Sequence, residues 1–269
     1  FSGNETDTNQ RTDFGIGGTN ETILSGDLSV NDDFDVNNDG YQGTTGDDNC
    51  YHIFYHPDSL SLTSSAILDG FTIKGGNANG TGIYNSGAGM CNIECSPIIS
   101  GCTFINNFAA SMGAGVENFN SLPTFTNCTF TNNHSWFCGG GLANIGSLPV
   151  ITSCIFDSNY ADWMGGGIFN IAESSPILTN CTIENNYSQG GAGITNFDES
   201  SPTLTNCVIE NNNSVVCGGM YNVYESSPTL INCIIVKNNA VTSAGGIGNS
   251  NNVTATLINC TIANNSSED

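Results

Sequence analysis

The sequence predicts an all-β protein, a right-handed, single-stranded parallel β-helix (a solenoid) of about seven coils. The first observation is a cysteine that recurs at steps of 26, 26, 27, 26, 26 and 27 residues. The second is a column of asparagines with the same period of 26 or 27 residues. The cysteines are Cys102, Cys128, Cys154, Cys181, Cys207, Cys233 and Cys260, and the asparagines are Asn92, Asn118, Asn144, Asn170, Asn196, Asn222 and Asn249. Two columns with one period indicate a stack of similar repeats.

The content of each period predicts three short strands per coil. Residues 190–212 contain short alternating apolar segments separated by Gly, Asn, Ser and Pro, which is typical of strands joined by turns. No segment of the chain shows a helical period over ten or more residues, which argues against a helical repeat. Neighbouring coils are expected to lie about 4.8 Å apart, the spacing of adjacent strands.

Alternation predicts which side chains face the interior. In one strand, Cys207 and Ile209 are expected to point inward, while Val208 and Glu210 point to solvent. The same inward position forms the apolar column Phe104, Phe130, Phe156, Ile183, Ile209, Ile235 and Ile262. Asparagine tolerates left-handed backbone geometry and can hydrogen-bond to its counterparts above and below. We therefore interpret the Asn92–Asn249 column as a structural ladder at the coil corners.

Short motifs in several coils resemble those of a known class of repeat protein. Two or three glycines followed by an apolar residue occur at residues 139–142 and 165–168, and Phe-x-x-Asn occurs at residues 104–107, 130–133 and 156–159. On these motifs, residues 66–269 resemble the bacterial right-handed β-helix repeat proteins, and most closely those with polymorphic outer-membrane-protein repeats. Later coils replace Phe with Ile, so the match is to a broad superfamily. The resemblance implies export and adhesion or display at a cell surface, and it supplies no catalytic residues.

The N-terminal segment departs from the repeat and predicts a separate unit. Coil-like sequence begins at Ala66, and Phe71 takes the place of the ladder cysteine. We therefore divide the chain into an acidic cap with irregular first coils at residues 1–65 and β-helix repeats at residues 66–269. The cap is expected to cover the end of the solenoid, because a bare end is an open sheet edge.

One motif in the cap carries metal chemistry. Residues 35–40 read Asp-Val-Asn-Asn-Asp-Gly, which matches the start of a calcium loop. The glutamate expected at position twelve is absent, since that position is Gly46, and Asp47 or Asp48 could replace it. A solvated acidic turn is the alternative interpretation. The calcium ligands of this hypothesis are Asp35, Asn37, Asp39, Tyr41, Asp47 and Asp48.

The charge balance limits the partners. Three basic residues stand against 25 Asp and Glu, which gives a formal net charge of −22. Nucleic acids and anionic membrane surfaces need clustered basic residues, so both are poor partners and no nucleic-acid binding is expected. No apolar run reaches the roughly 18 residues that cross a bilayer, so direct membrane insertion is not expected. The abundance of Asn, Thr, Ser and Gly is typical of exported bacterial proteins and predicts an extracellular or cell-surface location.

The twelve cysteines invite a disulfide framework, but the ladder argues against one. Stacked side chains are parallel, so their Cβ atoms lie about 4.8 Å apart, beyond the usual span of a bridge. We expect most ladder cysteines to be buried thiols that act as small apolar fillers. Cys91 and Cys95 are the local pair best placed to form a disulfide.

Binding is a better interpretation than catalysis. A polysaccharide lyase needs basic residues, and Lys74 and Lys237 are the only ones in the coils. A hydrolase needs paired carboxylates in one cleft, and no long loop is expected beside the outward carboxylates to form a pocket. We therefore predict no catalytic residues and a non-catalytic surface or structural scaffold with a role in adhesion or assembly. A polysaccharide-binding or polysaccharide-degrading β-helix is the alternative.

Outward side chains are the candidates for binding. Asp157, Glu184 and Glu210 are expected to form an acidic column in consecutive coils, and Thr203 and Thr205 form an outward Thr-x-Thr pair. Repeating surfaces suit a polymeric partner or a second copy of the chain. Thr-x-Thr pairs also resemble those of ice-binding solenoids, which is a second alternative. The chain stops directly after a coil strand, so end-to-end assembly into a filament is a further expectation.

The calcium hypothesis makes a direct prediction. Titration of the chain with millimolar calcium in a calorimeter should give saturable heat, because hard cations prefer carboxylate and amide oxygens. The double substitution Asp35→Asn and Asp39→Asn should abolish the heat, and Asp157→Asn should leave it unchanged. Absence of heat from the unsubstituted chain would contradict the hypothesis.

Overall fold

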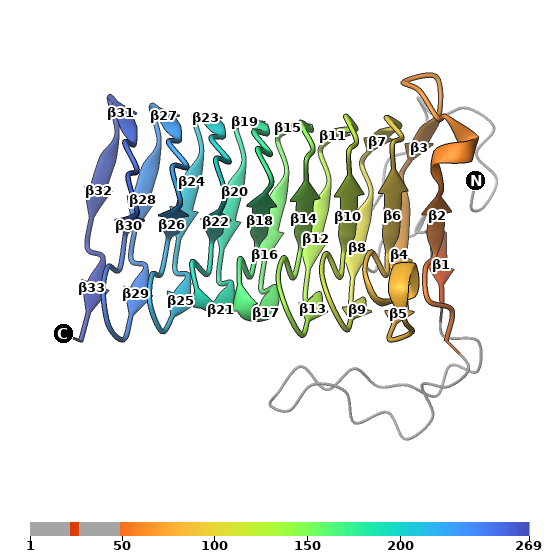
Figure 1. Ribbon diagram of the computed structural model, residues 1–269, viewed down its shortest axis with the longest axis horizontal. Helices are drawn as coiled ribbons and strands as arrows, with labels where there is room; N and C mark the ends of the chain where they lie inside the picture. The colour runs from red at the N-terminus through yellow and green to blue at the C-terminus, as the bar shows by residue number, and fades with distance from the viewer. Residues whose placement is uncertain (1–21, 27–48, 269) are drawn as a thin grey trace.

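The chain folds as a parallel β-solenoid (Figure 1). The computed structural model describes residues 22–26 and 49–268. Within these residues every strand pair is parallel, and each strand of a middle coil pairs with its equivalents in the coils before and after. In residues 22–26 and 49–268 the regular elements are strands, apart from two short 3₁₀ helices, η3 (Asp58–Leu60) and η4 (Gly82–Asn85). The predicted stack of coils is confirmed.

Two of the four sheets contain the strands on either side of the cysteine column. Sheet A consists of β1 (Thr22–Ser25), β4 (Phe71–Lys74), β8 (Thr103–Ile105), β12 (Thr129–Thr131), β16 (Ile155–Asp157), β20 (Thr182–Glu184), β24 (Val208–Glu210), β28 (Ile234–Val236) and β32 (Thr261–Ala263). Sheet C consists of β3 (Ile67–Asp69), β7 (Ile98–Ser100), β11 (Thr124–Thr126), β15 (Val150–Thr152), β19 (Ile177–Thr179), β23 (Thr203–Thr205), β27 (Thr229–Ile231) and β31 (Thr256–Ile258).

The other two sheets complete each coil. Sheet B consists of β2 (Phe54–His56), β6 (Met90–Ile93), β10 (Val116–Phe119), β14 (Leu142–Ile145), β18 (Ile168–Ile171), β22 (Ile194–Asn196), β26 (Met220–Val223) and β30 (Ile247–Ser250). Sheet D consists of β5 (Asn77–Ala78), β9 (Phe108–Ala109), β13 (His134–Ser135), β17 (Tyr160–Met164), β21 (Tyr187–Gly190), β25 (Asn213–Ser214), β29 (Asn239–Ala240) and β33 (Ser266–Ser267).

Sheet D corrects the prediction of three strands per coil, because a full coil has four. Most of its strands are two residues long, so alternation within them is too short to be recognised in the sequence. They lie between the Phe-x-x-Asn motif and the glycines that precede sheet B. Figure 1 shows sheet D along the lower edge of the solenoid and sheet C along the upper edge.

The interior consists of the predicted columns. Phe104 pairs with Phe130, and Phe130 with Phe156, with ring centroids 5.0 and 4.5 Å apart. The column continues through Ile183 to Ile235, and all members up to Ile235 are fully buried. The ladder cysteines from Cys102 to Cys233 are also buried. The apolar inward side chains therefore form one continuous core, the arrangement that alternation predicts.

The Asn92–Asn249 column is a hydrogen-bonded ladder, but it does not lie at the corners. Its members lie within the strands of sheet B and point inward, and those from Asn92 to Asn222 are fully buried. Each side-chain amide donates to the next coil, as in Asn144 Nδ2 to Asn170 Oδ1 at 2.8 Å and Asn170 Nδ2 to Asn196 Oδ1 at 2.8 Å. An amide carries both a donor and an acceptor, so a stack of amides satisfies itself without water. Other asparagines occupy the left-handed corner positions, including Asn127 and Asn185.

A second buried asparagine ladder fixes the turn into sheet D. Its members are Asn107, Asn133, Asn159, Asn186, Asn212, Asn238 and Asn265. The Asn186 side-chain amide donates both to Asn212 Oδ1, at 3.0 Å, and to the backbone oxygen of Phe156, at 2.9 Å. These asparagines close the Phe-x-x-Asn motif, whose conformational role is therefore to satisfy turn backbone groups.

The regular sheets begin before residue 66. Strand β1 pairs with β4 in sheet A, and β2 pairs with β6 in sheet B. Coil pairing thus includes parts of the segment at residues 1–65, most of which lies outside the described residues.

The inward ladder makes a prediction about stability. The substitution Asn170→Ala should lower the free energy of unfolding by at least about 2 kcal/mol, because it leaves the buried Asn144 donor and Asn196 acceptor without partners. Thr203→Ala, at a half-buried outward position, is the matched control and should cost less than about 1 kcal/mol. Denaturant unfolding followed by circular dichroism measures both. Equal losses for the two variants would contradict the role of the ladder.

Candidate functional site

The structure brings the predicted acidic column together on the outer surface of sheet A. Asp157 of β16 pairs with Glu184 of β20, which pairs with Glu210 of β24. All three side chains are half-buried. The next positions in the column are Val236 and Ala263, as the sequence indicates.

The two neighbouring carboxylates make Glu184 harder to ionise. Burial raises the pKa of Glu184 above its ordinary value, and the charges of Asp157 and Glu210 raise it further. Asn185 Nδ2 donates to Asp157 Oδ1 at 2.8 Å, which holds one end of the column in place. In residues 22–26 and 49–268, no group of three or more His, Cys, Asp or Glu side chains is arranged to hold a metal ion. The acidic column is therefore a line of negative charge along one surface.

The outer surface of sheet C differs from sheet A in having no charged side chain from β7 to β31. The burial pattern of β7 to β27 places their first and third residues outward and the middle residue in the core, and β31 continues the column at the end of the solenoid. The outward residues, which we call the neutral face, are Ile98, Ser100, Thr124, Thr126, Val150, Thr152, Ile177, Thr179, Thr203, Thr205, Thr229, Ile231, Thr256 and Ile258. Thr205 is the last of four threonines in consecutive coils, and Thr203 is the first of three.

Amides extend the neutral face around the corner toward sheet A. Exposed asparagines in the left-handed conformation occupy this corner in four successive coils, from Asn180 to Asn259. Their side chains form a surface ladder, with Asn206 Nδ2 to Asn180 Oδ1 at 3.2 Å and Asn259 Nδ2 to Asn232 Oδ1 at 2.7 Å. A partner would therefore meet hydroxyl, methyl and amide groups at regular spacing across this side of the solenoid.

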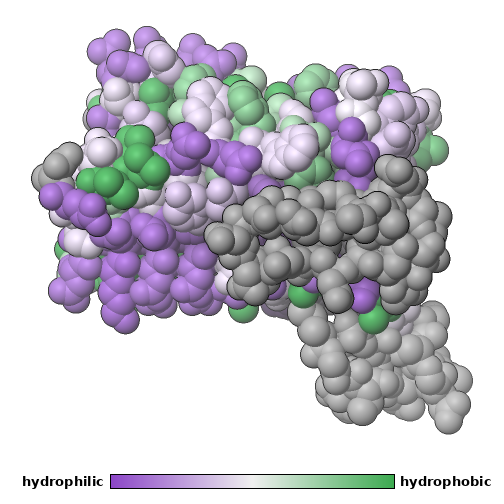
Figure 2. All heavy atoms as spheres, turned by 90° about the horizontal axis from the view of Figure 1, so that it is seen from below, coloured by the Kyte–Doolittle hydropathy of each residue, from purple (hydrophilic) through white to green (hydrophobic). Residues whose placement is uncertain are grey.

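A cluster of aromatic residues on sheet D is a site that the sequence analysis missed. Both tryptophans of the chain are here, and Trp136 and Trp163 are 52% and 41% exposed. We call the cluster the aromatic face, and its members are Phe108, His134, Trp136, Phe137, Tyr160, Trp163 and Tyr187. Figure 2 views the solenoid from this side, where side chains of intermediate and high hydropathy gather beside a block of hydrophilic ones.

The rings contact one another from coil to coil. The Tyr160 and Tyr187 rings are stacked with centroids 5.1 Å apart, and the Phe137 and Trp163 rings are 4.6 Å apart. Asp162 lies among them, with Oδ1 3.5 Å from His134 Nε2. Burial and the charge of Asp162 raise the pKa of Tyr160 to about 12, so its hydroxyl stays protonated.

The sequence contains a signal for this face. Phe108, His134, Tyr160 and Tyr187 each directly follow an asparagine of the second ladder, so they recur with the coil period. The prediction of three strands per coil does not include sheet D. It therefore does not say whether the side chains of these residues point inward or outward.

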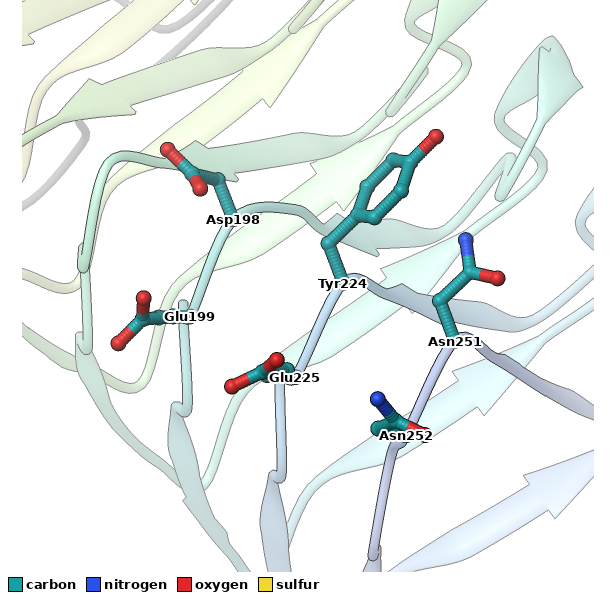
Figure 3. Close-up of a pocket in the computed structure, with 6 residues that line it drawn as sticks. All are labelled: Asp198, Glu199, Tyr224, Glu225, Asn251 and Asn252. Atoms are coloured by element: carbon teal, nitrogen blue, oxygen red, sulfur yellow. The ribbon is translucent and has the colours of Figure 1, made fainter.

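A shallow hollow lies at the turns between sheets B and C. Asp198, Glu199, Tyr224, Glu225, Asn251 and Asn252 line it. Each coil contributes two consecutive residues in the left-handed conformation, and the side chains of Glu199 and Glu225 extend to the same side (Figure 3). The hollow is small and open to solvent, which fits a surface turn better than an enclosed reaction site.

The cysteines are structural. All twelve are free thiols, including Cys91 and Cys95, so that predicted disulfide does not form. Ladder thiols donate to backbone oxygens, as in Cys207 Sγ to Thr205 O at 3.4 Å. Burial raises the pKa of Cys102, Cys138 and Cys217 to about 12, so these side chains remain unreactive thiols at neutral pH.

The carboxyl group of Glu117, in β10 of sheet B, is largely shielded from solvent. Cys91 Sγ donates to Glu117 Oε2 at 3.5 Å, and the two residues are paired between β6 and β10. Burial raises the pKa of Glu117 to about 7, although hydrogen bonds from Cys91 and Ser86 lower it. Glu117 is therefore largely protonated in the folded chain below neutral pH.

The predicted calcium ligands Asp35, Asn37, Asp39, Tyr41, Asp47 and Asp48 lie outside the described residues, so the calcium hypothesis stays a prediction. In the part of the chain that the structure describes, no helix is both long and apolar enough to cross a membrane.

Comparison with known proteins supports the fold. A family described as the right handed beta helix region matches residues 53–262. No curated protein and no solved structure is significantly similar to the chain. The narrower resemblance to polymorphic outer-membrane-protein repeats stays a prediction.

Glu117 makes the stability depend on pH. Its pKa is about 7 in the folded chain and about 4.5 when unfolded, so the folded state holds a proton that the unfolded chain loses between these values. The resulting stabilisation is present below pH 4.5 and is lost as the pH rises to about 7. Relative to Glu117→Gln, the free energy of unfolding of the unsubstituted chain should fall by about 3 kcal/mol across this window.

Unfolding curves at several pH values between 4 and 8 measure this difference. Glu225→Gln, at an exposed turn, is the control and should give a much smaller change. A pH dependence that is the same in Glu117→Gln as in the unsubstituted chain would contradict the assignment.

Proposed function

We propose that this chain, which belongs to the right-handed β-helix family, is a non-catalytic extracellular scaffold that adheres to an uncharged polysaccharide through its neutral face. The observation that carries the proposal is the neutral face itself. A chain with a net charge of −22 keeps charge off the outward residues of sheet C from β7 to β31. Solubility favours charge on every exposed surface, so a long uncharged surface points to contact with a partner.

The chemistry of the face favours an uncharged polymer. Threonine hydroxyls and asparagine amides can donate to and accept from sugar hydroxyls, while Ile177 and Val150 offer exposed apolar surface to sugar C–H groups. The negative field of the chain repels polyanions. The repeat also lets one polymer contact several coils at once, so weak contacts at each coil add to a useful avidity.

Two alternative functions make different predictions about the same surfaces. A polysaccharide-degrading enzyme would use the acidic column, where Asp157, Glu184 and Glu210 lie in consecutive coils. An ice-binding solenoid would use the same neutral face, and the four consecutive threonines that end at Thr205 favour it. Product release and thermal hysteresis distinguish these functions from adhesion.

The test places one charge on the neutral face. Thr205→Glu should reduce retention of the chain on insoluble, uncharged polysaccharides by about tenfold or more, because the new carboxylate must be desolvated in the contact. Asn213→Glu is the control. It adds the same charge at an exposed position of β25 in sheet D, in the same coil as Thr205, and it should leave retention unchanged. Co-sedimentation with a panel of such polysaccharides measures both.

Three outcomes would overturn the proposal. Equal losses for the two variants would mean that general charge, and not the neutral face, governs retention. Release of soluble sugars would show an enzyme, which Glu184→Gln should then inactivate. Thermal hysteresis that Thr205→Glu abolishes, without retention on any polysaccharide, would show an ice-binding protein.

A further inference from the structure

We propose that the aromatic face docks an arginine-bearing segment of another protein, with the arginine seated between Asp162 and Trp163. This inference goes beyond the proposed function, because it concerns a different sheet and a different class of ligand. It rests on the exposure of the rings, on the charge of Asp162 and on a change of pairing register beside Trp163.

The aromatic face exposes more apolar ring surface than the fold requires. Trp136, Phe137, Tyr160 and Trp163 are between 38% and 52% exposed, although they lie in only two neighbouring coils. Inward positions of the same strands hold the small residues Ser135 and Ala161, so the large rings contribute little to the core. Exposed tryptophan and tyrosine of this kind are typical of the central residues of protein interfaces.

The charge within the face selects a cation. The side chain of Asp162 is 42% exposed, and its Oδ1 lies 3.5 Å from His134 Nε2. Burial lowers the pKa of His134, so the imidazole is largely neutral at pH 7 and leaves the carboxylate uncompensated. The described lysines, Lys74 and Lys237, lie in other coils. A carboxylate between aromatic rings attracts a cation both by charge and through the ring faces.

The pairing register between β17 and β21 changes beside Trp163. Ala161 pairs with Ser188 and Met164 pairs with Gly190, so β17 has one more residue than β21 between these pairs. The preceding coil also has two residues in this stretch, since Ser135 pairs with Ala161 and Cys138 pairs with Met164. Gln189 is thus the single residue of β21 opposite both Asp162 and Trp163, and Gly190 beside it adds no side chain. Bulges of this kind re-aim side chains beside binding sites.

The combination of a carboxylate and exposed ring faces favours arginine over other cations. A guanidinium is planar, stacks on aromatic faces and binds a carboxylate through two parallel hydrogen bonds. The chain has a single arginine, Arg11, and its copies repel one another at a net charge of −22, so the partner is a different protein.

The test uses a nona-arginine peptide as the probe and the full chain as the receptor. Both tryptophans lie on the aromatic face, so tryptophan fluorescence reports on this face alone. The peptide should cause a saturable change at an ionic strength of about 0.15 M. Asp162→Asn should weaken the binding about tenfold or more, because it removes the desolvated charge partner. Glu210→Gln changes the net charge by the same amount on sheet A and should weaken binding less than about twofold.

Further variants separate stacking from charge. Trp163→Ala should weaken binding of the peptide, followed by anisotropy of a labelled copy, while Tyr224→Ala at an exposed turn should not. Nona-lysine should bind more weakly than nona-arginine.

Equal effects of Asp162→Asn and Glu210→Gln would show diffuse attraction to the acidic chain and overturn the proposal. So would a fluorescence response to chitosan oligosaccharides equal to that to nona-arginine, which would identify a glycan as the ligand. Loss of neutral-face adhesion in Thr205→Glu with peptide binding intact would show that the two sites are independent.

Discussion

The structure depends on the requirement that the inward residues of each coil lie directly above their counterparts in the next coil. Parallel pairing without a slip, from β4 to β32 in sheet A, fixes this register. A side chain that is accepted in one coil must then be compatible with the same type of side chain about 4.8 Å away. Phenylalanine and isoleucine meet this requirement by stacking, and asparagine meets it by donating to one neighbour and accepting from the other. Glycine meets it at positions such as Gly141, where a Cβ would overlap the backbone oxygen of Gly167.

This requirement explains what the sequence could predict. An inward side chain is restricted by two neighbours, so Cys, Phe or Ile, and Asn recur and their period is visible without any structure. The direction of the strand alternation follows from the same columns, and Cys207, Ile209 and Glu210 point as expected. The acidic column was predictable for this reason, because Asp157, Glu184 and Glu210 stand one residue beyond an inward column.

Two kinds of feature could not be predicted from the sequence. One is a strand too short to show alternation, and the other is a residue type that suits both a turn and a buried ladder. Two residues of β13 carry no alternation, so sheet D and the aromatic face were not recognised. Asparagine was assigned to the corners because it tolerates left-handed geometry, and Asn127 does occupy such a corner. The Asn144 column instead lies inside, since a stack of amides removes the usual cost of burying a polar group. The residue type of asparagine therefore does not reveal whether its side chain is buried or lies at a corner.

Outward side chains are free of the interior constraint, and their distribution is therefore the part of the sequence that function can shape. Sheets A, C and D have the same backbone repeat, yet one carries a line of carboxylates, one carries no charge from β7 to β31, and one carries the two tryptophans. Thr205 and Trp163 lie outside the inward columns that form the hydrophobic core. Adjacent faces of one rigid solenoid can thus offer different chemistry to different partners without affecting one another's packing.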